Sequence, residues 1–255
     1  MFKYVKKRVE GLFKKKIIRS VGILVGGTAF SQLIMLSALP FITRLYSPDD
    51  FSVLATYISL LALLTVIACL RFEIAIPIAK EEDASFHLFI LSLISVIGIT
   101  TLVLVLLFVF SEEVSEATNN RLNGYLWLIP IGVFFSGTYS ALQYWMTREQ
   151  KFSLVAKTRM TQSISAVTTQ LVCGFAGISP LGLLLGHLLS VGAGVFGLLR
   201  FFLKEYRILF KYFSLQKLKK TFKKFDRFPK YSTWEALTNS AGIQIPILII
   251  AALAI

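Results

Sequence analysis

The chain has 255 residues and carries 27 Lys and Arg against 14 Asp and Glu, a formal net charge of +13. Its hydrophobic content of 55% and mean hydropathy of +0.70 exclude an ordinary soluble core and predict an all-α integral membrane protein. The cations lie between apolar stretches. We therefore expect contact with anionic membrane lipids at the cytoplasmic face and no nucleic-acid partner.

Seven stretches are long and apolar enough to be predicted as membrane-spanning helices, because one crossing needs about 20 residues. A basic amphipathic helix is expected before them, over residues 1–20. The predicted spans are residues 21–46, 51–70, 86–110, 125–146, 160–178, 180–202 and 234–255, with the second continuing as a helix to Lys80. Residues 204–232 form a basic connector before the last span, which belongs to segment 233–255.

The basic residues alternate between the gaps that separate these spans. The N-terminus and the gaps after spans two, four and six hold 25 of the 27 Lys and Arg. This pattern predicts a multi-pass protein with a cytoplasmic N-terminus. It also supports the fifth span, which is diluted by polar residues such as Gln162 and Ser163, because without it the basic connector would lie outside. We expect that polar face to meet other helices or a wet cavity.

Other features predict packing rather than chemistry. Small residues recur every fourth position in the sixth span, at Gly182, Gly186, Ser190 and Gly194, and this spacing favours close helix contact. An amphipathic helix is expected around Leu218 in the connector. The two cysteines and the two histidines are expected to be structural, so no metal site, catalytic residue or cofactor is predicted.

Three separated stretches resemble a known family. They are GGTAFSQLIMLSALPFITRLYSPDDFSVLATYISL with LRFEIAIPIAKEED, LQYWMTREQKFSLVAKTRMTQSI, and FPKYSTWEALTNSAGIQIPILII. In this order they resemble the O-antigen and capsule repeat-unit flippases of the polysaccharide-biosynthesis group. That group belongs to the multidrug/oligosaccharidyl-lipid/polysaccharide exporter superfamily.

The resemblance implies two six-helix bundles around a central cavity. Residues 21–203 would form the first bundle and residues 233–255 the first helix of the second, so the chain is expected to be the N-terminal half of a longer transporter. The implied substrate is an undecaprenyl-diphosphate repeat unit that crosses the bacterial cytoplasmic (inner) membrane for surface polysaccharide such as lipopolysaccharide. Other polysaccharide-assembly membrane proteins are possible partners, and no enzyme activity is expected.

Such a substrate needs cations for its phosphates and amides or hydroxyls for its sugars. Charged residues in spans are costly, so Arg71 and Glu73 are the first candidates. They are expected to line the cytoplasmic mouth of the cavity or to reach the membrane interface. Two residues apart on one helix, they should not pair with each other.

The remaining candidates each keep two interpretations. Arg44 could form an ion pair with Asp49 or Asp50, or contact substrate at an outer gate. Arg148, Lys151, Lys157 and Arg159 are interpreted as topology signals, with a phosphate entry site as the alternative. Amides within the spans could serve helix–helix hydrogen bonds or sugar contacts: Gln32, Gln143, Gln170, Asn239 and Gln244.

Two other functions compete with the flippase. A cation-coupled multidrug exporter should carry a carboxylate deep in a bundle, whereas Glu73 is predicted near a helix end. A membrane enzyme of glycan assembly should show a large outward loop or clustered acids and histidines. The longest predicted outward gap has about 14 residues and no histidine. The chain also lacks the Gly-rich phosphate loop with Lys-Ser or Lys-Thr, so ATP hydrolysis by that route is not expected.

Overall fold

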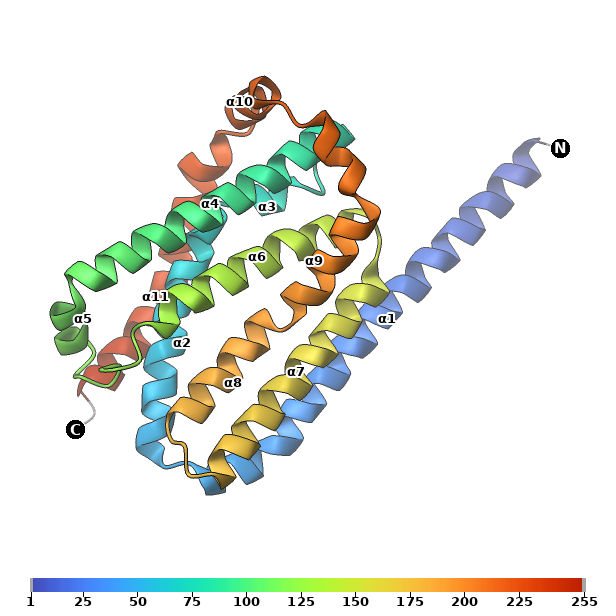
Figure 1. Cartoon of the computed structure of the whole chain (residues 1–255). Helices are drawn as coiled ribbons and strands as arrows, with labels where there is room; N and C mark the ends of the chain where they lie inside the picture. The colour runs from blue at the N-terminus through green and yellow to red at the C-terminus, as the bar shows by residue number, and fades with distance from the viewer. Residues whose placement is uncertain (1, 254–255) are drawn as a thin grey trace.

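The computed structural model describes the backbone of residues 2–253 and the side chains of residues 21–250. This part of the chain is helical and contains no strand, which confirms the predicted all-α class (Figure 1). The long helices are α1 (Phe2–Leu45), α2 (Pro48–Ala68), α4 (Glu82–Val109), α6 (Leu128–Arg148), α7 (Phe152–Phe175) and α11 (Thr233–Leu253). The short ones are α3 (Phe72–Ala75), α5 (Ser111–Ala117), α8 (Leu181–Gly192), α9 (Gly194–Glu205), the 3-10 helix η1 (Arg207–Tyr212), α10 (Leu215–Lys224) and the π-helical turn η2 (Phe228–Ser232).

Four segments are long and apolar enough to cross a membrane. They are Val21–Leu45 within α1, α2, α4, and Leu181–Glu205, which joins α8 and α9. Helices α6, α7 and α11 have 21, 24 and 21 residues and lie where three more spans were predicted. A membrane fold is thus confirmed, while the crossing of the bilayer by these three helices stays a prediction.

The helices pack lengthwise in pairs (Figure 1). Helix α7 lies between α1 and α8, α4 lies along α6, and α11 lies along α2. The main core is apolar and aromatic, and it centres on Trp145, Phe89 and Phe202, each at most 1% exposed. Aromatic rings in such edge and tilted contacts add specific packing to their burial.

Helix α2 begins with a complete capping box, which explains the tight turn predicted at residues 46–50. The Ser47 hydroxyl accepts a hydrogen bond from Asp50 N, and the Asp50 carboxylate accepts one from Ser47 N at 2.8 Å. Arg44 is exposed and forms no ion pair with Asp49 or Asp50. The predicted ion pair at this turn is therefore wrong, because the Asp50 carboxylate caps the helix instead.

The predicted continuation of the second span to Lys80 is also wrong. Leu70 and Arg71 have φ values of 49° and 63°, a left-handed backbone that ends a right-handed helix. The chain then turns back through α3 against α4 and α6. This turn buries Phe72 and Ile76, which are 1% and 0% exposed. A straight helix would have carried both side chains away from the core, so the break is stabilised by their burial.

The small-residue stripe of the predicted sixth span does mediate close packing. A Cβ on Gly182 would collide with Tyr46 Oη and Cys173 Cβ, and one on Gly186 would collide with Gln170. The predicted sixth span is found as the candidate span Leu181–Glu205, which is divided at Ala193 between α8 and α9.

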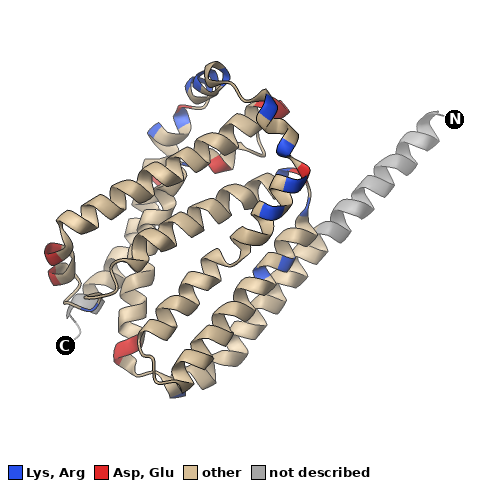
Figure 2. Ribbon diagram, viewed as in Figure 1, with Lys and Arg blue, Asp and Glu red and all other residues tan. Residues whose placement is uncertain are grey.

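Lys and Arg gather at one end of the described part of the molecule, around α10 and the nearby ends of α6 and α9 (Figure 2). Acidic residues occur at both ends, at the start of α4 beside α10 and on α5 at the opposite end. The predicted amphipathic helix in the connector is α10, which packs against α4. Leu218 of this helix and Phe225 just after it pack against the main core. The amphipathic side chains predicted within residues 1–20 lie outside the described side chains.

Candidate functional site

A polar cavity of about 340 Å³ lies between α1, α6, α7 and α8. Its volume falls in the range of small-molecule sites. Hydroxyl and amide side chains dominate its lining, which consists of Thr28, Ser31, Gln32, Met35, Ser136, Tyr139, Gln143, Arg159, Gln162, Ser163, His187, Ser190 and Val191. The cavity therefore offers many hydrogen-bonding groups among helices with apolar outer faces.

The polar face of α7 builds one wall of this cavity. Arg159, Gln162 and Ser163 follow the spacing i, i+3 and i+4, which places them on one side of a helix. Gln162 Nε2 donates to the Val191 carbonyl of α8 at 3.2 Å. The sequence prediction that this face meets helices or a wet cavity is thus confirmed. It meets both.

Helices α1 and α7 can approach closely because Gly27 faces Ala156. A Cβ built on Gly27 would lie 2.7 Å from the Ala156 Cβ, so no larger residue fits without a shift. This contact brings the hydroxyls of α1 to the cation of α7. Arg159 Nη1 donates to Thr28 Oγ1 at 3.3 Å.

Arg159 is the one Lys or Arg in the lining, and the lining contains no carboxylate. Among the described residues it forms no ion pair within 4.0 Å. Tyr139 and Thr158 share a hydroxyl–hydroxyl hydrogen bond of 3.2 Å beside it. A guanidinium whose charge is not neutralised suits a phosphate or another anion, since it can donate two parallel hydrogen bonds.

The structure brings some of the predicted site residues together and separates the others. Gln32 lines the cavity, together with Gln143. Asn239 is exposed and Gln244 is partly buried on α11, which packs along α2 and contributes nothing to this lining. Arg44 lies in the last turn of α1, beyond the residues of this helix that line the cavity. The predicted residues therefore do not form one site.

Arg71 and Glu73 occupy the turn between α2 and α4, outside the four candidate spans. Arg71 Nη1 lies 4.0 Å from Glu73 Oε1, so the prediction that the two would not pair is wrong. That prediction assumed one continuous helix. The left-handed backbone of Arg71 instead turns its side chain towards the start of α3.

Glu73 is 5% exposed, and its Oε2 accepts no hydrogen bond from the described residues. Burial raises the pKa of this carboxyl to about 7, while a backbone hydrogen bond and the Arg71 cation oppose the rise. The Glu73 carboxyl can therefore hold a proton near neutral pH. Arg71 is less suited to bind an anionic ligand, because it already lies beside this carboxyl group.

A comparison with protein families identifies the group to which this architecture belongs. A family model described as "polysaccharide biosynthesis protein" matches residues 41–254, most of the chain. The chain belongs to the polysaccharide biosynthesis protein family. The family and the apolar helices together make it a multi-pass membrane protein of polysaccharide biosynthesis. Neither curated proteins nor solved structures yield a match.

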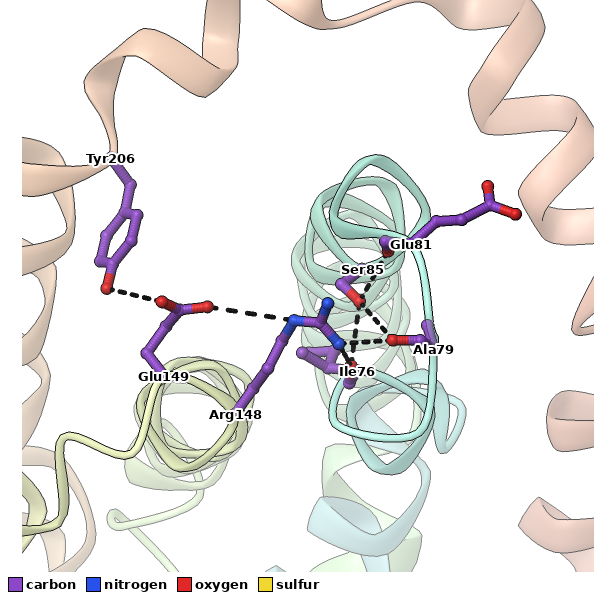
Figure 3. A network of polar contacts seen from close by, with 7 residues as sticks. All are labelled: Ile76, Ala79, Glu81, Ser85, Arg148, Glu149 and Tyr206. Carbon is purple, nitrogen blue, oxygen red and sulfur yellow. Dashed lines mark hydrogen bonds and ion pairs between the residues drawn. The ribbon is translucent and has the colours of Figure 1, made fainter. Parts of the chain in front are cut away.

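This polysaccharide biosynthesis protein also contains a polar network that the sequence did not predict (Figure 3). Arg148, at the end of α6, donates through Nη1 to the carbonyls of Ile76 at 3.1 Å and Ala79 at 2.5 Å. Its Nε lies 4.0 Å from Glu149 Oε1, and the Tyr206 hydroxyl donates to Glu149 Oε2 at 3.3 Å. Arg148 therefore ties the turn after α3 to the ends of α6 and α9.

The network shows that Arg148 and Arg159, two basic residues of the same predicted loop, have different roles: Arg148 binds backbone carbonyls, whereas Arg159 lines the cavity. In the sequence, Arg148 and Arg159 both appeared as topology signals, because a charge count does not distinguish them. The available signal for Arg159 was its helical spacing to Gln162 and Ser163. For Arg148 no local signal existed, since its acceptors lie about 70 residues earlier.

Proposed function

We propose that this chain is part of a transporter that moves a lipid-linked oligosaccharide, an undecaprenyl-diphosphate repeat unit, across the bacterial cytoplasmic membrane. The observation that carries the proposal is the polar cavity with one arginine and no carboxylate among apolar helices. Membership in the polysaccharide biosynthesis family supports it. A carrier of a lipid-linked sugar needs both apolar outer faces for the lipid and a polar cavity for the sugar.

In this mechanism no covalent bond is made or broken, so the protein is a carrier and not an enzyme. The Arg159 guanidinium binds a phosphate of the head group, while hydroxyls and amides such as Gln32 and Gln143 replace water around the sugars. The lipid tail stays against the outer, apolar faces of the helices. A second bundle, of which α11 would be the first helix, closes the cavity on alternate sides.

The proposed orientation places the basic end of the molecule in the cytoplasm of the inner membrane. The gathering of Lys and Arg around α10 and the ends of α6 and α9 supports this, by the positive-inside rule (Figure 2). The head group would then enter the cavity from the side on which it is synthesised. Other membrane proteins of polysaccharide assembly are proposed partners on that route.

The test is binding of undecaprenyl diphosphate to the purified chain in detergent. Arg159→Ala should weaken binding at least tenfold, because a charge-assisted hydrogen bond contributes about 1.5–3 kcal/mol. Arg159→Lys should recover part of the affinity. Lys157→Ala is the matched control, since Lys157 is exposed on the same helix and lies outside the cavity. Equal affinity of Arg159→Ala and the unchanged chain would refute the assignment of the cavity.

A cation-coupled multidrug exporter is the second candidate, and the burial of Glu73 favours it. A carboxyl with one oxygen lacking a partner can take up and release a proton. This function predicts proton-driven efflux of a cationic dye from vesicles, lost in Glu73→Gln. The flippase proposal predicts that surface glycan export depends on Arg159, and that no dye is transported.

A further inference from the structure

The segment that follows α9 combines fixed aromatic anchors with an exposed amphipathic surface. Tyr206 follows the last residue of α9 and packs edge-on against Trp145, with ring centroids 5.5 Å apart, and Phe210 packs edge-on against Phe86 at 5.4 Å. These contacts hold η1 on the end of the bundle. On the other side, Ile208 remains 59% exposed and Phe210 43% exposed.

A groove of about 1000 Å³ lies along this exposed side. Two cations and three apolar residues line it, namely Arg207, Lys211, Leu203, Ile208 and Phe210. Apolar and cationic side chains in one groove suit a ligand that has a hydrocarbon part and an anionic part. A free anion would leave the apolar side chains exposed to water.

The two cations of the groove are not neutralised by the protein. Arg207 and Lys211 form no ion pair with any carboxylate in the described part of the chain. In contrast, Lys217 of the neighbouring α10 lies 2.9 Å from Asp83, and Lys224 lies 3.9 Å from Glu81. Charge complementarity therefore favours an anionic ligand in the groove. The same argument does not apply to Lys217 and Lys224, because carboxylates of the protein already lie beside them.

The position along the fold fits a lipid headgroup. The apolar candidate span Leu181–Glu205 ends two positions before Arg207. The cations consequently lie where a span leaves the hydrocarbon, the depth at which lipid phosphates are found, and Leu203 lies on the apolar side of that boundary. The groove is thus continuous with the lipid-facing surface of α9.

We propose that η1 and the last turn of α9 form a binding site for one anionic phospholipid. Arg207 and Lys211 bind the headgroup phosphate, and Leu203, Ile208 and Phe210 hold the start of an acyl chain. The bound lipid secures η1, and with it the connection from α9 to α10. This site is separate from the cavity around Arg159, and the proposal does not depend on which substrate the protein carries.

The test is native mass spectrometry of the whole chain in detergent, titrated with dioleoyl phosphatidylglycerol or dioleoyl phosphatidylcholine. The unchanged chain should retain one phosphatidylglycerol in preference to phosphatidylcholine. Arg207→Gln with Lys211→Gln should weaken phosphatidylglycerol binding about 25-fold, roughly fivefold for each cation removed near the membrane surface. Ile208→Ser should weaken both lipids, because it removes apolar lining without changing charge.

The matched control is Lys219→Gln with Lys220→Gln on α10. These lysines are exposed, carry the same charge and lie outside the groove. The control should change phosphatidylglycerol affinity by less than about threefold. If both double variants weaken binding equally, only a general charge attraction exists and the site is refuted. Equal retention of the two lipids by the unchanged chain would refute it as well. Circular dichroism of each variant verifies that it is folded.

Discussion

Arginine side chains lie both at the polar cavity and at the turn between α2 and α4. At the cavity the guanidinium has no carboxylate beside it, whereas at the turn the guanidinium groups are bound by carbonyls or lie beside a carboxylate. In the cavity, Arg159 donates to one threonine hydroxyl at 3.3 Å, and no carboxylate lines the space. At the turn, Arg148 of α6 donates to two backbone carbonyls, and Arg71 lies 4.0 Å from Glu73. An arginine is available to an anionic ligand when no carboxylate neutralises its charge and no backbone carbonyl depends on its donors.

The difference has a physical cause in the backbone of the two regions. Intact helices satisfy their own amides and carbonyls, so the walls of the cavity place no demand on the guanidinium of Arg159. The turn breaks the helix at Leu70 and Arg71 and leaves carbonyls such as those of Ile76 and Ala79 without helical partners. Arg148 and the Ser85 hydroxyl donate to them, so the guanidinium of Arg148 is used to stabilise the fold.

The largest effect is expected from removing the structural arginine. Arg148→Ala should lower the free energy of unfolding by about 4 kcal/mol, because two hydrogen bonds from a charged donor are lost and the two buried carbonyls keep only the Ser85 hydroxyl as a shared donor. Unfolding of the purified protein by SDS in mixed micelles, followed by circular dichroism, measures this. Arg200→Ala is the control, since Arg200 is exposed on α9. A loss no greater than that of the control would mean that the turn does not depend on Arg148.

A smaller effect, visible as a pH dependence, is expected from Glu73→Gln. The pKa of Glu73 is raised from 4.5 to about 7, so folding favours the protonated carboxyl. That stabilisation is complete below pH 4.5 and is lost as the pH rises through 7. Glutamine resembles the protonated form, so the variant should be more stable than the unchanged protein at pH 8 by about 3 kcal/mol.

The same unfolding titration at pH 4 and pH 8 measures this difference. The two proteins should have nearly equal stability at pH 4. Parallel stability curves over the whole range would show that Glu73 keeps its ordinary pKa and that its burial in the turn does not favour the protonated carboxyl.

The smallest effect tests the wall of the cavity. Gly27→Ala should destabilise the protein by about 2 kcal/mol, since the added Cβ would lie 2.7 Å from the Ala156 Cβ and force α1 away from α7. Gly26→Ala is a close control, because nothing lies within 4 Å of its Cβ position. The separation should also weaken the bond from Arg159 to Thr28. Equal stability of the two variants would contradict the close contact of α1 and α7.

The periodic and compositional features of this protein were predictable from the sequence. The apolar stretches at α1, α2, α4 and α8–α9, the small-residue stripe from Gly182 and the amphipathic helix α10 all appear in the structure. Each depends on residues close together in the chain. Of the proposed site, the sequence indicated Gln32 and the polar face of α7, which are also local features.

The arrangement of charged side chains was not predictable in the same way. The helix break at Arg71, the pairing of Arg71 with Glu73 and the bonds of Arg148 to Ile76 and Ala79 all depend on where α3 packs. A charge count treats Arg148 and Arg159 as equivalent. Only the packed helices separate them.

The sequence alone determined that the chain is an all-helical membrane protein with its cations gathered on alternate loops, because hydrophobic length and charge are properties of short segments. The tertiary structure decided which cations are free and which are used. The reason is that hydrogen-bond partners are supplied by helices distant in sequence, and burial depends on all of them together. Arg159 faces a cavity only because α1, α6, α7 and α8 meet around it.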